Sequence, residues 1–305
     1  MWCLVVSIML FSTAAPPTGD AVIRAEAGDS QIVITTTKRL AGAIHSLTFR
    51  GVEYVDSTDH GRQIQSASNL NCGKSPYHSE TFNPTEAGSR HDHVGPTSSS
   101  KLLMLHTRDN ELKTTIQMAF WLRPNEKSGG HPALNTTVLS DHLVTKHVRI
   151  GFKDMPRVIQ YDVTFTLPDG EHHTWAQFEA VTGYMPPAFS KFYRYDPVKQ
   201  ALQPLSDGPG EQAYPVVLAT ADGKHAMCVY SPDQPSKGFE HAGYGRWRFE
   251  KERVVKWNCV FRVRDKAGVK AGEYAYRNFV IVGTVEEVTR DLKALYAMFK
   301  DEAGE

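Results

Sequence analysis

Apolar and polar residues alternate along most of the chain, and a two-residue period is typical of β-strands that bury one face. Helical periodicity is nearly absent before residue 284. The pattern therefore predicts an all-β protein. The predicted strands span residues 31–37, 43–49, 52–55, 101–107, 112–122, 143–150, 157–167, 173–181, 214–220, 225–231, 246–250, 254–263 and 273–283.

Short turn sequences such as those at 168–170, 207–210 and 221–223 separate the strands, and they carry the Gly, Pro and Asp residues that tight turns favour. No internal repeat or low-complexity linker divides the chain of 305 residues. All-β sandwiches often exceed two hundred residues in one unit. We therefore expect one large antiparallel β-sandwich domain over residues 21–305.

The last predicted element is a helix. Thr284 and Glu287 form the sequence signature of a capping box. Apolar residues then recur at three- and four-residue steps, which places them on one helix face that we expect to pack on the sandwich. These residues are Val285, Val288, Leu292, Leu295 and Phe299.

The N-terminal region predicts secretion. An apolar stretch runs from Trp2 to Phe11, and the small residues Ala14 and Ala15 follow it, as in a signal peptide with its cleavage site. We expect residues 1–20 to be a signal peptide and the mature protein to be extracellular or periplasmic. The stretch is too short to span a bilayer, and no other segment predicts a membrane span.

Composition restricts the partners. The chain has 34 basic and 34 acidic residues, and 41% of its residues are hydrophobic. A globular protein without net charge lacks the concentrated positive field that nucleic acids or anionic membranes require, so we expect no nucleic-acid partner. Cys259 alternates with Trp257 and Phe261, which predicts a core position for its side chain.

The predicted strand 173–181 has an unusual face. Alternation places His173, Trp175, Gln177 and Glu179 on one side. An aromatic ring that stacks on a sugar, beside polar groups that bond its hydroxyls, suits carbohydrate recognition. A solvated sheet face that happens to carry a tryptophan is the alternative.

A long loop at 69–100 interrupts the strand pattern, and ordered loops of this length are usually functional. Its segment FNPTEAGSRHDHVG at 82–95 allows three interpretations. His91 and His93, with Glu86 or Asp92, could bind zinc or calcium. Glu86 and one histidine could move protons, with Arg90 stabilising negative charge. The side chains could also simply bond the backbone of their own loop.

Two further groups could act on a sugar. Arg62, next to Gln63, has the planar fork that pairs with a carboxylate or sulfate. Tyr77 and His78 form a couple that β-elimination can use, in which one group removes a proton and the other protonates the leaving oxygen.

The segment GAIHSLTFRGVEYVDSTDHGRQIQ, from Gly42 to Gln65, resembles the early strands of the galactose-mutarotase-like superfamily of carbohydrate-active proteins. The shared features are a G-x-I-x-S-L strand, a hairpin and a second strand reading G-x-E-Y. The resemblance implies a large antiparallel sandwich with a concave surface that faces a sugar. It carries no catalytic residue over by position.

We therefore expect a secreted carbohydrate-active protein that cleaves a polysaccharide or oligosaccharide by hydrolysis or β-elimination and needs no cofactor, unless zinc or calcium binds the loop. The expected catalytic residues are Glu86, His91, His93, Glu179, His173 and Tyr77. The expected substrate-binding residues are Arg62, Gln63, Arg90, Trp175 and Gln177. The alternative is a non-catalytic carbohydrate-binding or envelope protein that uses the Trp175 face.

Overall fold

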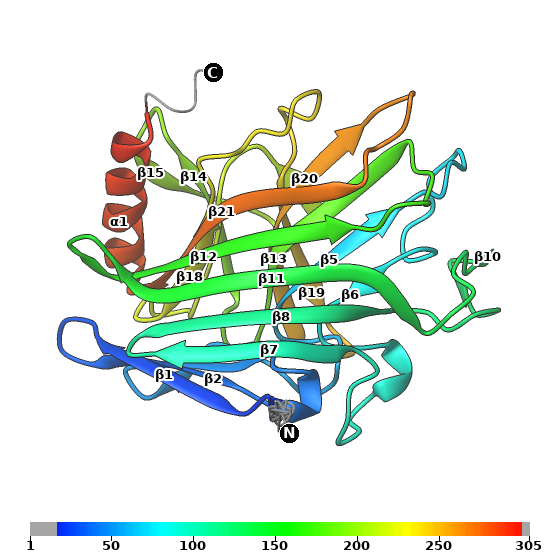
Figure 1. Ribbon diagram of the computed structural model, residues 1–305. Helices are drawn as coiled ribbons and strands as arrows, with labels where there is room; N and C mark the ends of the chain where they lie inside the picture. Colours follow the sequence, from blue (N-terminus) through cyan, green and yellow to red (C-terminus); the bar gives the residue numbers. More distant parts are fainter. Residues whose placement is uncertain (1–16, 301–305) are drawn as a thin grey trace, which may run out of the picture.

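The computed structural model describes residues 17–300, and it confirms an all-β chain with one C-terminal helix (Figure 1). Its strands form two antiparallel layers. The first sheet has the order β7 (Lys101–Arg108), β8 (Glu111–Phe120), β11 (Leu139–Phe152), β12 (Met155–Leu167), β21 (Gly272–Gly283), β18 (Ala226–Tyr230), β17 (Val216–Ala219), β14 (Lys191–Asp196) and β15 (Ala201–Pro204). The second sheet has the order β1 (Ala21–Glu26), β2 (Gln31–Thr36), β3 (Ile44–Phe49), β5 (Ile64–Leu70), β13 (Trp175–Met185), β20 (Val254–Arg264), β19 (Tyr244–Phe249) and β16 (Gly210–Gln212).

Short elements complete the sheets. Strand β6 (Pro84–Thr85) pairs with both β5 and β8 and so connects the two layers, while β4 (Val52–Glu53) pairs antiparallel with the end of β3. Strands β9 (Lys127–Ser128) and β10 (His131–Pro132) form a separate hairpin. The two 3-10 turns are η1 (Lys38–Leu40) and η2 (Arg90–Asp92).

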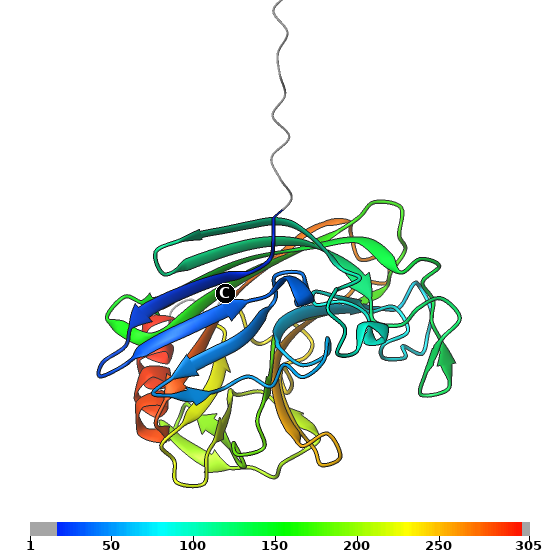
Figure 2. The same ribbon diagram turned by 90° about the horizontal axis from the view of Figure 1, so that it is seen from below.

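The core lies between the layers, which Figure 2 shows from below. Alternation along each strand sends every second side chain inward. Phe165 of β12 and Phe178 of β13 meet there, with ring centroids 5.0 Å apart. Cys259 is fully buried, as predicted. Because residues of β13 point alternately to the core and away from it, burial of Phe178 directs Gln177 and Glu179 to the opposite face.

Helix α1 (Val285–Met298) begins at the predicted capping box, since the Thr284 and Glu287 side chains each accept a bond from the other's backbone N–H. It packs on β18, β21 and β12 with its apolar face. Arg157 of β12 also forms an ion pair of 3.0 Å with the buried Asp291 of the helix. The helix closes one side of the sandwich (Figure 1).

The alternation pattern missed several strands, among them β1, β14 and β15. In β14 the buried positions, Phe192 and Tyr195, lie three residues apart and so do not follow the two-residue period. The predicted signal peptide lies largely outside the described residues. Within residues 17–300 no helix has both the length and the apolar character needed to cross a bilayer.

Candidate functional site

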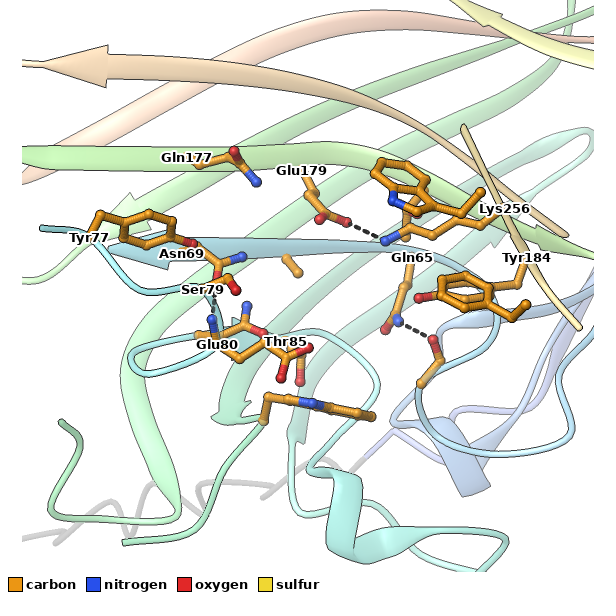
Figure 3. Close-up of a pocket in the computed structure, with 17 residues that line it drawn as sticks. Gln65, Asn69, Tyr77, Ser79, Glu80, Thr85, Gln177, Glu179, Tyr184 and Lys256 are labelled. Atoms are coloured by element: carbon orange, nitrogen blue, oxygen red, sulfur yellow. Dashed lines mark hydrogen bonds and ion pairs between the residues drawn. The ribbon is translucent and has the colours of Figure 1, made fainter. Parts of the chain in front are cut away.

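A pocket of about 350 Å³ opens on the face of the second sheet that points away from the core (Figure 3). Strands β5, β13, β19 and β20 form one wall, and the loop between β5 and β6 forms the other. Polar and aromatic side chains dominate its lining. They are Gln65, Asn69, Tyr77, Ser79, Glu80, Asn83, Thr85, Trp121, Gln177, Glu179, Thr182, Tyr184, Trp247, Phe249 and Lys256, with Gly61 and Ala67 between them.

Strand register positions the sheet wall. In the antiparallel pair of β13 and β5, Gln177 lies opposite Asn69 and Glu179 opposite Ala67. Directly opposed residues share one face of a sheet. Ala67 has the smallest side chain of this row, which leaves space in front of the Glu179 carboxylate.

Glu179 forms an ion pair with Lys256 of β20, with 3.4 Å between Oε2 and Nζ. The Lys256 ammonium also lies 5.1 Å from the ring centroid of Tyr184 and 5.0 Å from that of Trp247. Burial lowers the pKa of Lys256, but the Glu179 carboxylate and the Tyr184 phenol outweigh it and hold this pKa above its ordinary value. Lys256 is therefore cationic at neutral pH.

Glu80 and Tyr77 come from the loop wall (Figure 3). The Glu80 backbone has a φ of 65°, which is uncommon for a residue other than glycine, and its N–H donates to Asn69 Oδ1 at 3.0 Å. Such backbone conformations persist where neighbouring contacts impose them, often at functional sites. The Glu80 carboxylate accepts a bond of 2.6 Å from Ser128 of the β9–β10 hairpin.

Tyr77 lies near both carboxylates of the pocket. Burial, followed by the charges of Glu179 and Glu80, raises the pKa of its phenol. Its ring packs against Trp175, with centroids 3.9 Å apart. At neutral pH the Tyr77 phenol therefore stays protonated, so it can donate a hydrogen bond but does not act as a base. Trp175 supports the pocket from behind Tyr77 and is not part of the lining.

Glu86 lies in the core, away from the pocket. It is fully buried and forms an ion pair with Lys146, whose side chain is 1% exposed. Its second oxygen accepts a bond of 2.9 Å from the Ser66 backbone N–H. Thr85 lines the pocket, and Glu86, the next residue, points to the opposite side of the chain.

The other charged residues of the 82–95 segment bond to the loop itself and to a neighbouring loop. His91 contacts Glu126 at 2.5 Å, and Arg90 contacts the same carboxylate at 3.2 Å. His93 uses its backbone carbonyl, which accepts from the His60 N–H at 2.9 Å. None of the three lines the pocket.

Arg62 and Gln63 also point elsewhere. Arg62 pairs with Asp59 at 3.1 Å, and Gln63 is buried and donates to the Asp59 carbonyl. Neither lines the pocket. Gln177, in contrast, lines it and accepts a bond of 2.8 Å from Arg262 Nε.

His173 belongs to a separate cluster just before β13. Glu171 Oε2 lies 2.7 Å from Nε2 of both His142 and His173. In the described part of the chain this is the one group whose donor atoms are close enough for a metal. However, His173 Nδ1 accepts from the Cys72 backbone N–H at 3.1 Å, so its proton is on Nε2 and donates to Glu171. A metal ligand needs that nitrogen unprotonated, and the set therefore does not fit a metal.

Several residues of the lining were not predicted from the sequence, among them Glu80, Trp121, Trp247 and Lys256. The strand residues had a usable signal. Lys256 precedes Trp257, which is fully buried, and Trp247 lies directly opposite Lys256 in the register of β19 and β20. Pairing β19 and β20 as a hairpin would have placed these two side chains on one face, and the pairing of β20 with β13 brings that face to Glu179. Glu80 and Trp121 lie in irregular segments, where residue spacing carries no such information.

Compared as a sequence, the chain matches no protein-family model and no curated protein. Its structure is similar to a protein in glycosyl hydrolase family 38 from Enterococcus faecalis, with a TM-score of 0.53, 10% identity and coverage of 94% of this chain and 32% of that one. An alpha-mannosidase from Enterococcus faecalis gives a TM-score of 0.51 at 9% identity, with coverage of 94% and 31%. A heparan sulfate lyase mutant from Pedobacter heparinus gives 0.42 at 8% identity, with coverage of 87% and 35%.

The chain thus spans about a third of the length of these solved chains. At such low identity the two similarities above 0.5 show a shared fold. That fold is one that occurs as a β-rich part of carbohydrate-active proteins.

Proposed function

We propose that this protein is a secreted carbohydrate-active enzyme that hydrolyses a glycosidic bond in the Glu179 pocket. The observation that carries the proposal is that Glu80 of the loop wall and Glu179 of the sheet wall line one pocket, with Tyr77 close to both. Most glycoside hydrolases use two carboxylates, which lie on either side of the glycosidic bond that is cleaved.

The pocket also suits a sugar by its lining. Its volume is in the range of roughly 300–1,000 Å³ that is typical of small-molecule sites. Trp121, Trp247 and Phe249 offer aromatic surface, and side-chain amides offer donors and acceptors for hydroxyl groups. Gln65 Oε1 is a buried acceptor without a hydrogen-bond partner among residues 17–300, which favours a ligand that can donate a hydrogen bond.

The role of Glu179 follows from its surroundings, and that of Glu80 follows by elimination. Lys256 offsets the charge of Glu179, so we assign Glu179 the role of base or nucleophile, and Glu80 that of the acid that protonates the leaving oxygen. Hydrolysis is favoured over β-elimination because burial raises the pKa of both Tyr77 and Tyr184, which makes either phenol a poor base. The lining contains no histidine.

Activity of the full chain on a panel of neutral and uronic oligosaccharides tests this proposal, with Glu179→Gln and Glu80→Gln beside the wild type. We expect new reducing ends without unsaturated products, and a loss of about 10²-fold or more in each variant. Glu273→Gln is the matched control, because Glu273 lies on an exposed position of β21. It should keep full activity.

Binding without turnover would support the non-catalytic carbohydrate-binding alternative, and unsaturated products would support elimination. Wild-type activity in Glu179→Gln would remove the assignment of this pocket as the active site.

We also propose that residues 1–20 are removed on secretion, because the apolar segment from Trp2 to Phe11 and the small residues after it resemble a signal peptide. Mass spectrometry of the protein recovered from the medium or periplasm tests this. An intact Met1 on the exported protein would refute it.

A further inference from the structure

A second and larger cavity, of about 670 Å³, lies at the C-terminal part of β20, between this strand, the loop at 233–239 and Tyr276 of β21 in the first sheet. We infer that it binds an anionic group, a carboxylate or sulfate, of a sugar unit adjacent to the one in the Glu179 pocket. This inference rests on the proposed function. Its lining combines basic and aromatic residues, namely Lys237, Arg262, Arg264, Phe239, Phe261 and Tyr276, together with Asp233 and four uncharged residues.

The two cavities meet at one side-chain pair. Arg262 lines the second cavity, and its Nε donates to Oε1 of Gln177, which lines the first. Arg262 lies opposite Gln177 in the register of β20 and β13, and Arg264 lies opposite Trp175. If an oligosaccharide extends from the Glu179 pocket past Gln177, its next sugar unit therefore lies beside Arg262 and Arg264.

The positive charge of this cavity is only partly offset. Arg262 pairs with Glu211 at 2.7 Å, and the cavity's one acidic residue, Asp233, pairs with Arg277 at 2.7 Å. Arg264 and Lys237 have no carboxylate within ion-pair distance among residues 17–300. An anionic ligand would supply the missing counter-charge.

Aromatic packing holds the guanidinium groups in place. Arg262 and Arg264 both stack on the Phe239 ring, at 5.7 Å and 5.3 Å from its centroid. The loop that carries Phe239 is tied to β20, because Gln234 Nε2 donates to the Val260 carbonyl and Ser236 Oγ accepts from the Arg262 N–H. Arg262 already uses Nε and Nη2 to bond Gln177 and Glu211. The Arg264 guanidinium is therefore the one that presents its edge to a ligand, and such an edge binds carboxylate and sulfate through two parallel hydrogen bonds.

Calorimetry on the full chain tests the inference with three oligosaccharides of equal length, one neutral, one containing uronate and one sulfated. We expect an anionic ligand to bind at least tenfold more tightly than the neutral one at low salt, and the preference to shrink as salt increases. Arg264→Gln should remove about tenfold of that preference and leave neutral binding unchanged. The stronger of the two anionic ligands identifies the group.

Arg24→Gln is the matched control, since Arg24 is an exposed arginine on β1. An unchanged preference in Arg264→Gln, or equal binding of neutral and anionic ligands by the wild type, would overturn the inference while Glu179-dependent turnover still stood. Conversely, Arg264-dependent anion binding without any Glu179-dependent turnover would refute the hydrolase and retain the anion site. Absence of binding to all three ligands would overturn both.

Discussion

The buried ion pair between Glu86 and Lys146 makes a quantitative prediction about stability. Both side chains are almost fully excluded from solvent, and the pair connects β11 to the segment that follows β6. In Lys146→Met the Glu86 carboxylate would retain one hydrogen bond, from the Ser66 N–H at 2.9 Å, and no counter-charge. The Lys146 ammonium would also leave the ring of Tyr161, whose centroid is 5.6 Å away.

Removing one partner of a buried ion pair lowers the free energy of unfolding by about 3–5 kcal/mol, because the remaining charge stays desolvated. At about 2 °C per kcal/mol for a chain of this length, Lys146→Met should lower the melting temperature by about 6–10 °C. Urea unfolding followed by fluorescence, and thermal unfolding by calorimetry, measure both quantities. Glu86→Leu/Lys146→Met, which removes both charges, should recover most of the loss because it leaves no isolated charge.

Lys224→Met is the control, since its partner Asp222 is exposed and 3.8 Å away. This substitution should lower the free energy of unfolding by no more than about 1 kcal/mol. A free energy of unfolding of Lys146→Met within about 1 kcal/mol of the wild-type value would contradict this reasoning. Glu86 would then have a role other than structural pairing with Lys146.

Two further predictions concern the His142–Glu171–His173 cluster and the C-terminal helix. Burial opposes ionisation of Glu171, but hydrogen bonds from His142 and His173 lower its pKa to about 2 from an ordinary 4.5, so its contribution to stability is present above pH 4.5 and is lost as the pH falls toward 2. The difference in unfolding free energy between the wild type and Glu171→Gln should therefore narrow over that range in urea titrations, and a difference that stays constant would refute the assignment. Thr284→Ala removes the N-cap of α1 and should cost about 1 kcal/mol in urea unfolding, whereas Thr289→Ala, inside the helix, should cost less. Equal losses would show that the capping box does not stabilise the helix selectively.

The fold could be predicted to a large extent because its signals are local. Alternation assigned His173, Trp175, Gln177 and Glu179 to one face, and the structure confirms this for the last three. His173 precedes β13 and is buried against Glu171. The capping-box signature correctly predicted that α1 begins after Thr284. These features depend on neighbours within a few residues, and a single sequence contains that information.

The site could be predicted only in part because it depends on contacts between distant segments. Glu86 resembled a loop carboxylate, yet its role is set by Lys146, 60 residues further along. A signal for that pairing was available. Lys146 occupies an inward position between Val144 and Val148, and a buried lysine requires a buried carboxylate. The sequence alone did not indicate which carboxylate would supply the charge.

The β9–β10 hairpin, which belongs to neither sheet, has a consequence for how such a protein diversifies. Ser128 holds the Glu80 carboxylate, and His131 stacks on His78 with ring centroids 3.4 Å apart. The loop wall thus takes part of its shape from a surface hairpin outside the two sheets. Changes of length or sequence in these two segments can remodel the pocket while the residues that maintain the fold stay the same, so new ligand preferences can arise on an unchanged scaffold.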